Sequence, residues 1–174
     1  MARQIARWSK QYKDSETNLI PEMDNLIEWL PQNIPPGEET SIVHGDFRLD
    51  NMVFDKNTNE VIAILDWELS TLGHPIADFT YHMMTWRMPL GVQGIGILGA
   101  NLQELNIPNE DEYAEAYYRK TNRNEIQNWD FFLAYNMFRL AGITQGIAGR
   151  VRDGTASSDQ AKQYGSFVPI LSQM

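Results

Sequence analysis

The sequence predicts a mostly helical α+β fold with a small β-hairpin, and three observations lead to this prediction. Apolar residues recur at helical spacing along much of the 174-residue chain. Short apolar runs at residues 41–43, 52–54 and 61–65 break that pattern, and turn-forming residues separate the last two. The apolar fraction of 43% is typical of a folded globular protein. The length suits one domain or two small ones, and we expect a single domain over residues 1–174.

The segment before the first apolar run predicts two helices followed by a connector. Residues 2–13 form an amphipathic segment whose apolar face is made, at helical spacing, by Ile5, Trp8 and Tyr12. Pro21 suits the first turn of a second helix. We expect the apolar stripe of that helix to be buried, at Met23, Leu26, Ile27 and Leu30. Pro31 and the Pro-Pro-Gly at residues 35–37 should end this helix.

After the connector, the prediction is a hairpin and then a helical region. The apolar run at residues 61–65 is expected to be a buried strand that pairs with residues 52–54. Further helices are predicted at residues 76–86, 110–121 and 129–148, and from Ser158 onward. Residues 88–109 are rich in Gly and Pro and are expected to be irregular.

Composition excludes several classes of function. The net charge of −9 argues against nucleic-acid binding, which needs clustered Lys and Arg, and weakly against anionic membranes. The chain has no cysteine, so disulfides and thiolate catalysis are excluded. It contains no apolar run of about 18 residues and no apolar core of a signal peptide near residue 1. We therefore expect no membrane span and a cytoplasmic location.

One segment concentrates side chains of chemical interest: it reads HGDFRLDN, at residues 44–51, and ILDWE follows at residues 64–68. The predicted hairpin brings Asn51 and Asp66 to one end, where their oxygens can share a hard cation such as Mg²⁺. Asp46 is then placed to accept a proton from a hydroxyl group. This division of roles suits phosphoryl transfer, and the spacing is that of a kinase catalytic loop followed by a metal-binding Asp.

The two motifs and their flanks resemble the aminoglycoside phosphotransferase and choline kinase superfamily, whose members are relatives of protein kinases. The resemblance is strongest to phosphotransferase-like domains that occur alone in bacteria or fused to acyl-CoA dehydrogenases. The segments that carry it read RQIARWSKQY, SIVHGDFRLDN, LDWELSTLGHPIADFTY and FRLAGITQGIAGR. They span almost the whole chain.

The resemblance implies a role for each motif residue. Asp46 would be the catalytic base, and Asn51 and Asp66 would bind the Mg²⁺ that accompanies ATP. The alternative is that all three are ordinary turn and cap residues, which would require their spacing to arise by chance. His44 is expected to brace the loop rather than to bind metal.

Three further residues receive supporting roles. Arg48 lies two residues after the catalytic Asp, where protein kinases carry a Lys that steadies the transferred phosphate. It could instead pair with Asp50 or Glu68. Glu68 could lie just outside the metal site, and Asp78 matches an acidic residue that holds the catalytic loop from the start of a helix.

The chain departs from the superfamily at its beginning. Only 43 residues precede His44, they predict two helices, and no glycine occurs before Gly37. The superfamily's nucleotide-covering loop and strand Lys are therefore not found, and we expect a C-terminal lobe whose N-terminal lobe is missing. Alone, it should be inactive, and the face that meets the missing lobe should be apolar and open to a homodimer contact.

A second motif, G-x-G-x-x-G at residues 94–99, resembles a phosphate-binding loop. The segment before it predicts a helix ending at Pro89 rather than a strand, and the motif follows the catalytic loop instead of preceding it. We therefore interpret it as a flexible loop beside the substrate cleft.

The predicted function is ATP- and Mg²⁺-dependent phosphorylation of a hydroxyl group on a small molecule. The resemblance favours a hydroxyacyl-CoA or a related metabolite as acceptor. The acidity of the chain would instead suit an aminoglycoside or a choline-type amine. A third alternative is a non-catalytic remnant that serves in binding or oligomerisation.

Overall fold

The computed structural model describes residues 1–37, 39–92, 95–123, 127–156 and 165–174. The α-helices are α1 (Ala2–Ser15), α2 (Pro21–Gln32), α3 (Pro75–Met83), α4 (Glu110–Thr121), α5 (Trp129–Arg152) and α7 (Phe167–Ser172). Short 3₁₀ turns occupy η1 (Leu49–Asn51), η2 (Trp67–Leu69) and η3 (Met84–Trp86). The strands are β1 (Ser41–Val43), β2 (Met52–Phe54), β3 (Val61–Ile64) and β4 (Thr71–Gly73). The mostly helical α+β prediction is confirmed.

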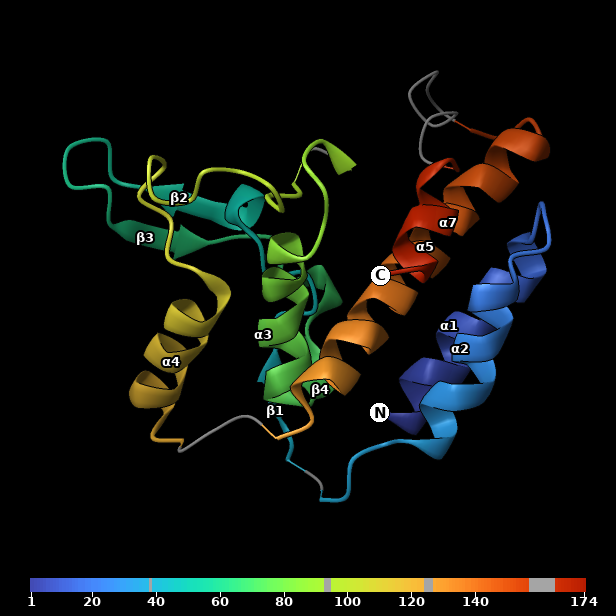
Figure 1. The fold of residues 1–174 in the computed structure, drawn as a ribbon, viewed down its shortest axis with the longest axis horizontal. Helices are drawn as coiled ribbons and strands as arrows, with labels where there is room; N and C mark the ends of the chain where they lie inside the picture. Colours follow the sequence, from blue (N-terminus) through green and yellow to red (C-terminus); the bar gives the residue numbers. More distant parts are fainter. Residues whose placement is uncertain (38, 93–94, 124–126, 157–164) are drawn as a thin grey trace.

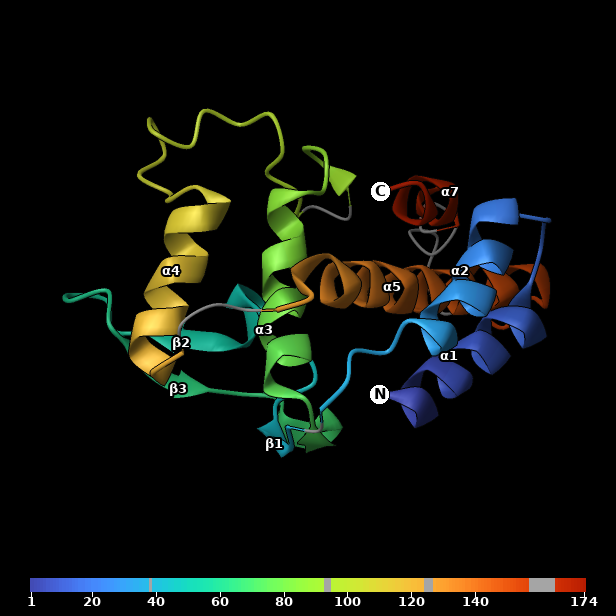
Figure 2. The same cartoon turned by 60° about the horizontal axis from the view of Figure 1, so that its bottom comes forward.

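Helix α5 is the centre of the fold. It packs against α1, α7 and α3, and Figures 1 and 2 show it running from α3 towards the group formed by α1, α2 and α7. Its sequence is apolar on most faces, and Phe138 and Ala141 are fully buried. A helix that is apolar nearly all round must be covered on several sides, which explains its central place.

Two small antiparallel sheets adjoin α3. The β2–β3 pair lies on the side of α3 away from α1, α2 and α7, and the β1–β4 pair lies at the N-terminal end of α3 (Figures 1 and 2). Strands β2 and β3 form the predicted hairpin. Strand β4 was not predicted; it pairs with β1 so that Ile42 faces Leu72 across the sheet. The prediction that residues 61–65 are buried was wrong, because Val61 and Ile62 are 48% and 63% exposed. One side of this hairpin is left uncovered by the described residues.

Several helix boundaries differ from the prediction, most clearly those of α2 and α5. Helix α2 continues through Pro31 to Gln32. Proline removes one backbone donor there, in the last turn of the helix. Helix α5 extends beyond residue 148 to Arg152, whose side chain hydrogen-bonds the backbone carbonyl of Glu16 at 2.8 Å. The helix expected from Ser158 begins on residues that lie outside the described ones.

The Gly-rich segment has a structural explanation in the part that is described. A Cβ atom on Gly96 would lie 2.1 Å from the carbonyl oxygen of Pro89, so only glycine fits this close approach. Gly94 lies outside the described residues. Among the helices that the structure describes, none is long and apolar enough to span a membrane.

Candidate active site

The loop that carries Asp46 begins directly after β1 and is shaped by a glycine. Gly45 has φ +84°, in the left-handed region, and a Cβ atom there would lie 2.6 Å from the carbonyl oxygen of Leu69. Only glycine avoids both problems. The backbone can therefore turn sharply between His44 and Asp46.

His44 joins the two motifs. Its ring is 3% exposed, and Nδ1 accepts a hydrogen bond from the backbone N–H of Asp46 at 3.2 Å. Because a backbone N–H can only donate, the ring hydrogen lies on Nε2, which donates to the carbonyl oxygen of Leu65 at 2.8 Å. The ring also contacts Trp67, with centroids 4.7 Å apart. His44 thus ties the catalytic-loop candidate to the segment that carries Asp66.

Asp78 holds the same loop from the other side. It lies in the first turn of α3, and its two carboxylate oxygens accept hydrogen bonds from the backbone N–H groups of His44 at 2.7 Å and Gly45 at 2.8 Å. Hydrogen bonds to a carboxylate are stronger than those between neutral groups. One side chain therefore fixes two consecutive peptide groups next to Asp46.

Asp46, Asn51 and Asp66 lie at one end of the β2–β3 pair. The Asn51 side-chain amide donates to a carboxylate oxygen of Asp46 at 3.1 Å and to its carbonyl oxygen at 2.8 Å. The carbonyl oxygen of Asn51 accepts from the backbone N–H of Leu65 at 2.8 Å, and Asp66 follows directly. Asp66 is exposed and has a left-handed backbone with φ 63°, which turns the chain as it leaves β3.

This donor set fits Mg²⁺. The amide nitrogen of Asn51 faces Asp46, which leaves the amide oxygen of Asn51 available, and Asp66 adds an exposed carboxylate. Mg²⁺ takes one or two protein oxygens and completes its shell with water and substrate phosphates. The described residues contain no group of three or more His, Cys, Asp or Glu side chains that could enclose a metal by themselves.

Arg48 forms ion pairs beside this site. Its Nη2 atom lies 3.0 Å from an oxygen of Asp50, and its Nε atom lies 3.7 Å from an oxygen of Asp46. Of the two partners considered from the sequence, the structure gives Asp50. Glu68 is exposed and lines a cavity on the side of the loop that faces α1.

Two further residues at the site were not assigned to it from the sequence. Arg139 of α5 donates to the carbonyl oxygen of Gly45, and its guanidinium lies 4.7 Å from the ring centre of Tyr81. Burial raises the pKa of Tyr81 to about 12, and the negative charge of Asp46 adds to this effect. Tyr81 therefore keeps its proton at neutral pH. One feature of the sequence could have drawn attention to Arg139: it is the only charged residue between positions 131 and 149.

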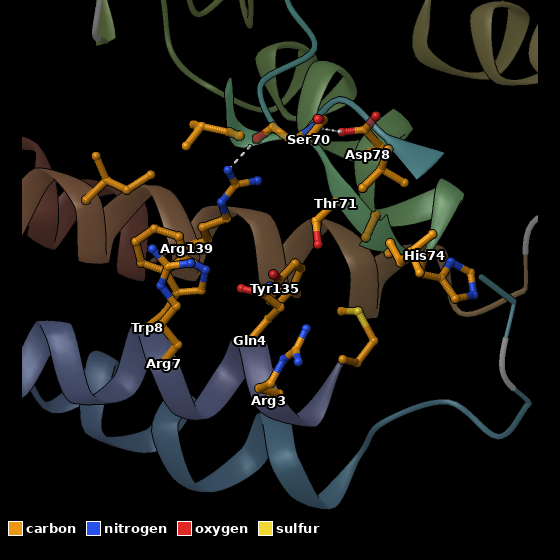
Figure 3. A pocket seen from close by; sticks show the side chains of 18 of the residues that line it. Arg3, Gln4, Arg7, Trp8, Ser70, Thr71, His74, Asp78, Tyr135 and Arg139 are labelled. Atoms are coloured by element: carbon orange, nitrogen blue, oxygen red, sulfur yellow. Dashed lines mark hydrogen bonds between the residues drawn. The ribbon is translucent and has the colours of Figure 1, made fainter. Parts of the chain in front are cut away.

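A cavity of about 760 Å³ adjoins this loop (Figure 3). It lies between α1, the β1–β4 pair and α5, and its wall includes Gly45 and Asp78. Arg3 extends from α1 towards the space below Thr71, and Arg139 reaches up from α5 to the loop (Figure 3). The volume is in the range of small-molecule sites in proteins.

The fold and this loop are those of the kinase-like phosphotransferase fold. The sequence matches the phosphotransferase enzyme family, APH, over residues 1–124, and the chain belongs to this family. The resemblance seen in the sequence is thereby confirmed.

Known relatives and a solved structure agree with this assignment. Acyl-CoA dehydrogenase family member 10 of Mus musculus is 41% identical over 99% of the chain, and family member 11 of Homo sapiens is 40% identical over 98%. A candidate aminoglycoside phosphotransferase of Ralstonia eutropha has 52% identity and a TM-score of 0.93 over 98% of the chain. The chain spans 16% and 22% of the two dehydrogenase family members and 52% of the bacterial protein.

Proposed function

We propose that the chain is the C-terminal lobe of an ATP- and Mg²⁺-dependent phosphotransferase that acts on a hydroxyl group. The observation that carries this proposal is the hydrogen bond between the Asn51 amide and the Asp46 carboxylate. Asp66 lies close by, because it directly follows Leu65, whose backbone N–H donates to the carbonyl oxygen of Asn51. This arrangement supports Asp46 as the general base beside two oxygens suited to Mg²⁺.

The chemistry follows from these positions. The hydroxyl oxygen of the acceptor bonds to the γ-phosphorus of ATP, the bond to the ADP oxygen breaks, and Asp46 accepts the hydroxyl proton. Asn51 and Asp66 would hold Mg²⁺, which neutralises charge on the phosphates when it is bound. Arg48, 3.7 Å from Asp46, would contact the transferred phosphoryl group. His44 and Asp78 keep the loop in place for this step.

The nucleotide-covering lobe is the partner that the proposal needs. Large apolar side chains are exposed along the two strand pairs and the loops between them: Ile42, Leu49, Phe54, Val61, Ile62, Leu65, Trp67, Leu69 and Leu72. Exposed apolar area of this extent marks an interaction surface. The family resemblance makes the N-terminal lobe its occupant. The DNA upstream of Met1 tests this: it should encode a Gly-rich loop and a strand Lys in frame.

A second copy of the chain could cover this surface instead. Sedimentation of the chain alone measures whether a homodimer forms, and alanine at Ile42 and Leu72 should weaken any such dimer. A monomer at all concentrations would remove the homodimer proposal and leave the lobe proposal standing.

For the acceptor, we propose a hydroxyacyl-CoA or a related hydroxy metabolite. Support comes from relatives whose names are acyl-CoA dehydrogenase family members and which match almost the whole chain. The second candidate is an aminoglycoside or a choline-type amine, supported by the name of the Ralstonia eutropha neighbour and by the net charge of −9. A non-catalytic remnant is disfavoured by the intact Asp46, Asn51 and Asp66.

The test is steady-state kinetics of variants in a polypeptide that carries both lobes. Asp46→Asn should lower kcat by ~10²–10⁴ with little change in ATP affinity, because it removes the proton acceptor. Asp66→Asn should raise the Mg²⁺ concentration needed for activity. Asp14→Asn, on the 62%-exposed side chain of α1, is the matched control and should be silent. Full activity in Asp46→Asn would overturn the catalytic role.

A further inference from the structure

We propose that the cavity between α1, β4 and α5 binds the acidic group of the acceptor, and that Arg3 and Arg7 are its anion contacts. The group is a phosphate or a carboxylate that the acceptor carries besides its reacting hydroxyl. This inference rests on the proposed phosphotransferase function and names the chemical class of the acceptor.

The first line of support is the availability of the two arginines. Arg3 and Arg7 are four residues apart on α1, so they lie on the same face of the helix, and both line the cavity. Both side chains are exposed. Within the part of the chain that the structure describes, every ion pair uses other cations, and neither Arg3 nor Arg7 has a carboxylate partner.

An aromatic ring positions the cationic wall. Trp8 is only 8% exposed, and the guanidinium groups of Arg7 and Arg139 lie 5.3 Å and 5.5 Å from its ring centre. The ring attracts both cations through its electron-rich faces. The two guanidinium groups, which repel each other, are therefore held near the buried Trp8 ring. Figure 3 shows Arg7, Trp8 and Arg139 together beside Tyr135.

The charge of the cavity is opposite to that of the chain. The whole chain carries −9, yet the charged side chains that line the cavity are three arginines and two acids, namely Arg3, Arg7, Arg139, Glu68 and Asp78. Both oxygens of Asp78 are already used by backbone amides of the loop. Glu68 is therefore the one acid in this wall that is free to oppose an anion. A cationic aminoglycoside would meet the wrong charge here.

The cavity also leads to the reacting loop. Arg139 lines its wall and donates to the carbonyl oxygen of Gly45, the residue before Asp46. The hydroxyl-bearing residues Ser70 and Thr71 line the wall between the loop and α1. An acceptor whose anion lies on Arg3 and Arg7 can therefore extend along this wall towards Asp46. The local field, rather than the net charge, then selects the acceptor.

The experiment is calorimetric titration of the 174-residue chain with three probes, and with pantetheine as a comparison for coenzyme A. Coenzyme A offers phosphates, 4-hydroxybutyrate offers a carboxylate, and kanamycin offers cations. We expect the wild-type chain to bind at least one of the two anions more tightly than kanamycin. The double variant Arg3→Gln/Arg7→Gln should lose at least tenfold in that affinity, which corresponds to about 1.4 kcal/mol. Lys10→Gln, an exposed cation on α1 outside the cavity wall, is the control and should bind as wild type.

The outcomes separate this inference from the proposed function. Equal anion affinity in the wild type and the double variant, no binding of either anion, or tighter binding of kanamycin would each overturn the anion site. Pantetheine, which lacks the phosphates of coenzyme A, decides whether phosphate is the group that is bound. Asp46→Asn should leave this binding unchanged, so loss or survival of catalysis in that variant does not affect the result.

Discussion

The helical group and the site segment of this molecule are stabilised in different ways. In the helical group, large apolar side chains are fully buried between helices, among them Tyr12, Met23, Leu30 and Phe138. In residues 41–73, the site segment, most large apolar side chains are exposed. The loop is fixed by the hydrogen bond that the His44 ring donates to Leu65 and by those that the Asp78 carboxylate accepts from the loop amides. Burial determines the stability of the first region, and polar contacts determine the geometry of the second.

This difference shows how the fold separates stability from chemistry. Segments with little buried apolar area can adjust to ligands and partners, because opening them costs less than opening the core. The site segment nevertheless keeps its shape, since Asp78 and Arg139 anchor it to α3 and α5.

The largest effect on stability is expected in the helical group. Phe138 is fully buried in α5, and Phe138→Ala should lower the free energy of unfolding by about 3–5 kcal/mol, because it removes buried area and leaves a cavity. Urea denaturation followed by circular dichroism measures this. A loss of less than about 1 kcal/mol would show that α5 is not the centre of the core.

The next effect lies in the contact between the two regions. Asp78→Ala leaves the amides of His44 and Gly45 without their acceptor, and an unsatisfied buried group costs about 1–3 kcal/mol. Hydrogen exchange should show faster exchange of these two amides, and thermal melts should show the lost stability. Asp130→Ala, whose side chain is 91% exposed, is the control. Unchanged exchange at both amides would mean that Asp78 does not hold the loop.

A smaller, pH-dependent effect is expected at His82. Burial lowers the pKa of His82, so the unfolded chain binds a proton more readily than the folded protein. Stability is then fully present above the unfolded pKa of about 6.5 and is lost as pH falls towards the folded pKa. His82→Phe keeps a ring against Phe47 and Trp86 but cannot titrate. Melting temperatures from pH 8 to pH 5 should therefore fall less steeply in this variant than in the wild type.

The smallest effect is expected on the exposed sheet. Ile42 is 73% exposed and faces Leu72 across the β1–β4 pair. Ile42→Thr keeps a β-branched side chain, so it should change the unfolding free energy of the chain by no more than about 0.5 kcal/mol. A loss comparable to that of Phe138→Ala would contradict the contrast between the two regions.

Much of the fold could be predicted from sequence because long helices and the hairpin have strong local signals. Helices α1, α4 and most of α5 follow from apolar spacing, and the β2–β3 hairpin follows from its turn residues. Strand β4 was missed because its three residues, Thr-Leu-Gly, form no apolar run, and because its partner β1 is far away in the sequence. The exposure of β3 was missed because an apolar run indicates that a strand forms but does not show whether other residues cover that strand.

The site shows the same division between local and distant information. Asp46, Asn51 and Asp66 could be grouped from spacing, because one hairpin connects them. Arg139 and Tyr81 could not be placed there, since they reach the loop from α5 and α3 through tertiary packing. The cationic cavity was also not visible in the sequence. The net charge of −9 instead favoured a cationic acceptor.

We infer that Asn51 and Asp66 hold a divalent cation beside Asp46. Paramagnetic broadening by Mn²⁺, followed by NMR on the 174-residue chain, tests it directly. We expect the amide signals of residues 45–51 and 65–67 to broaden first in the wild type, and we expect Asp66→Asn to remove this selectivity. Broadening that is unchanged in Asp66→Asn, or that centres on the acidic first turn of α4 at Glu110, Asp111 and Glu112, would contradict it.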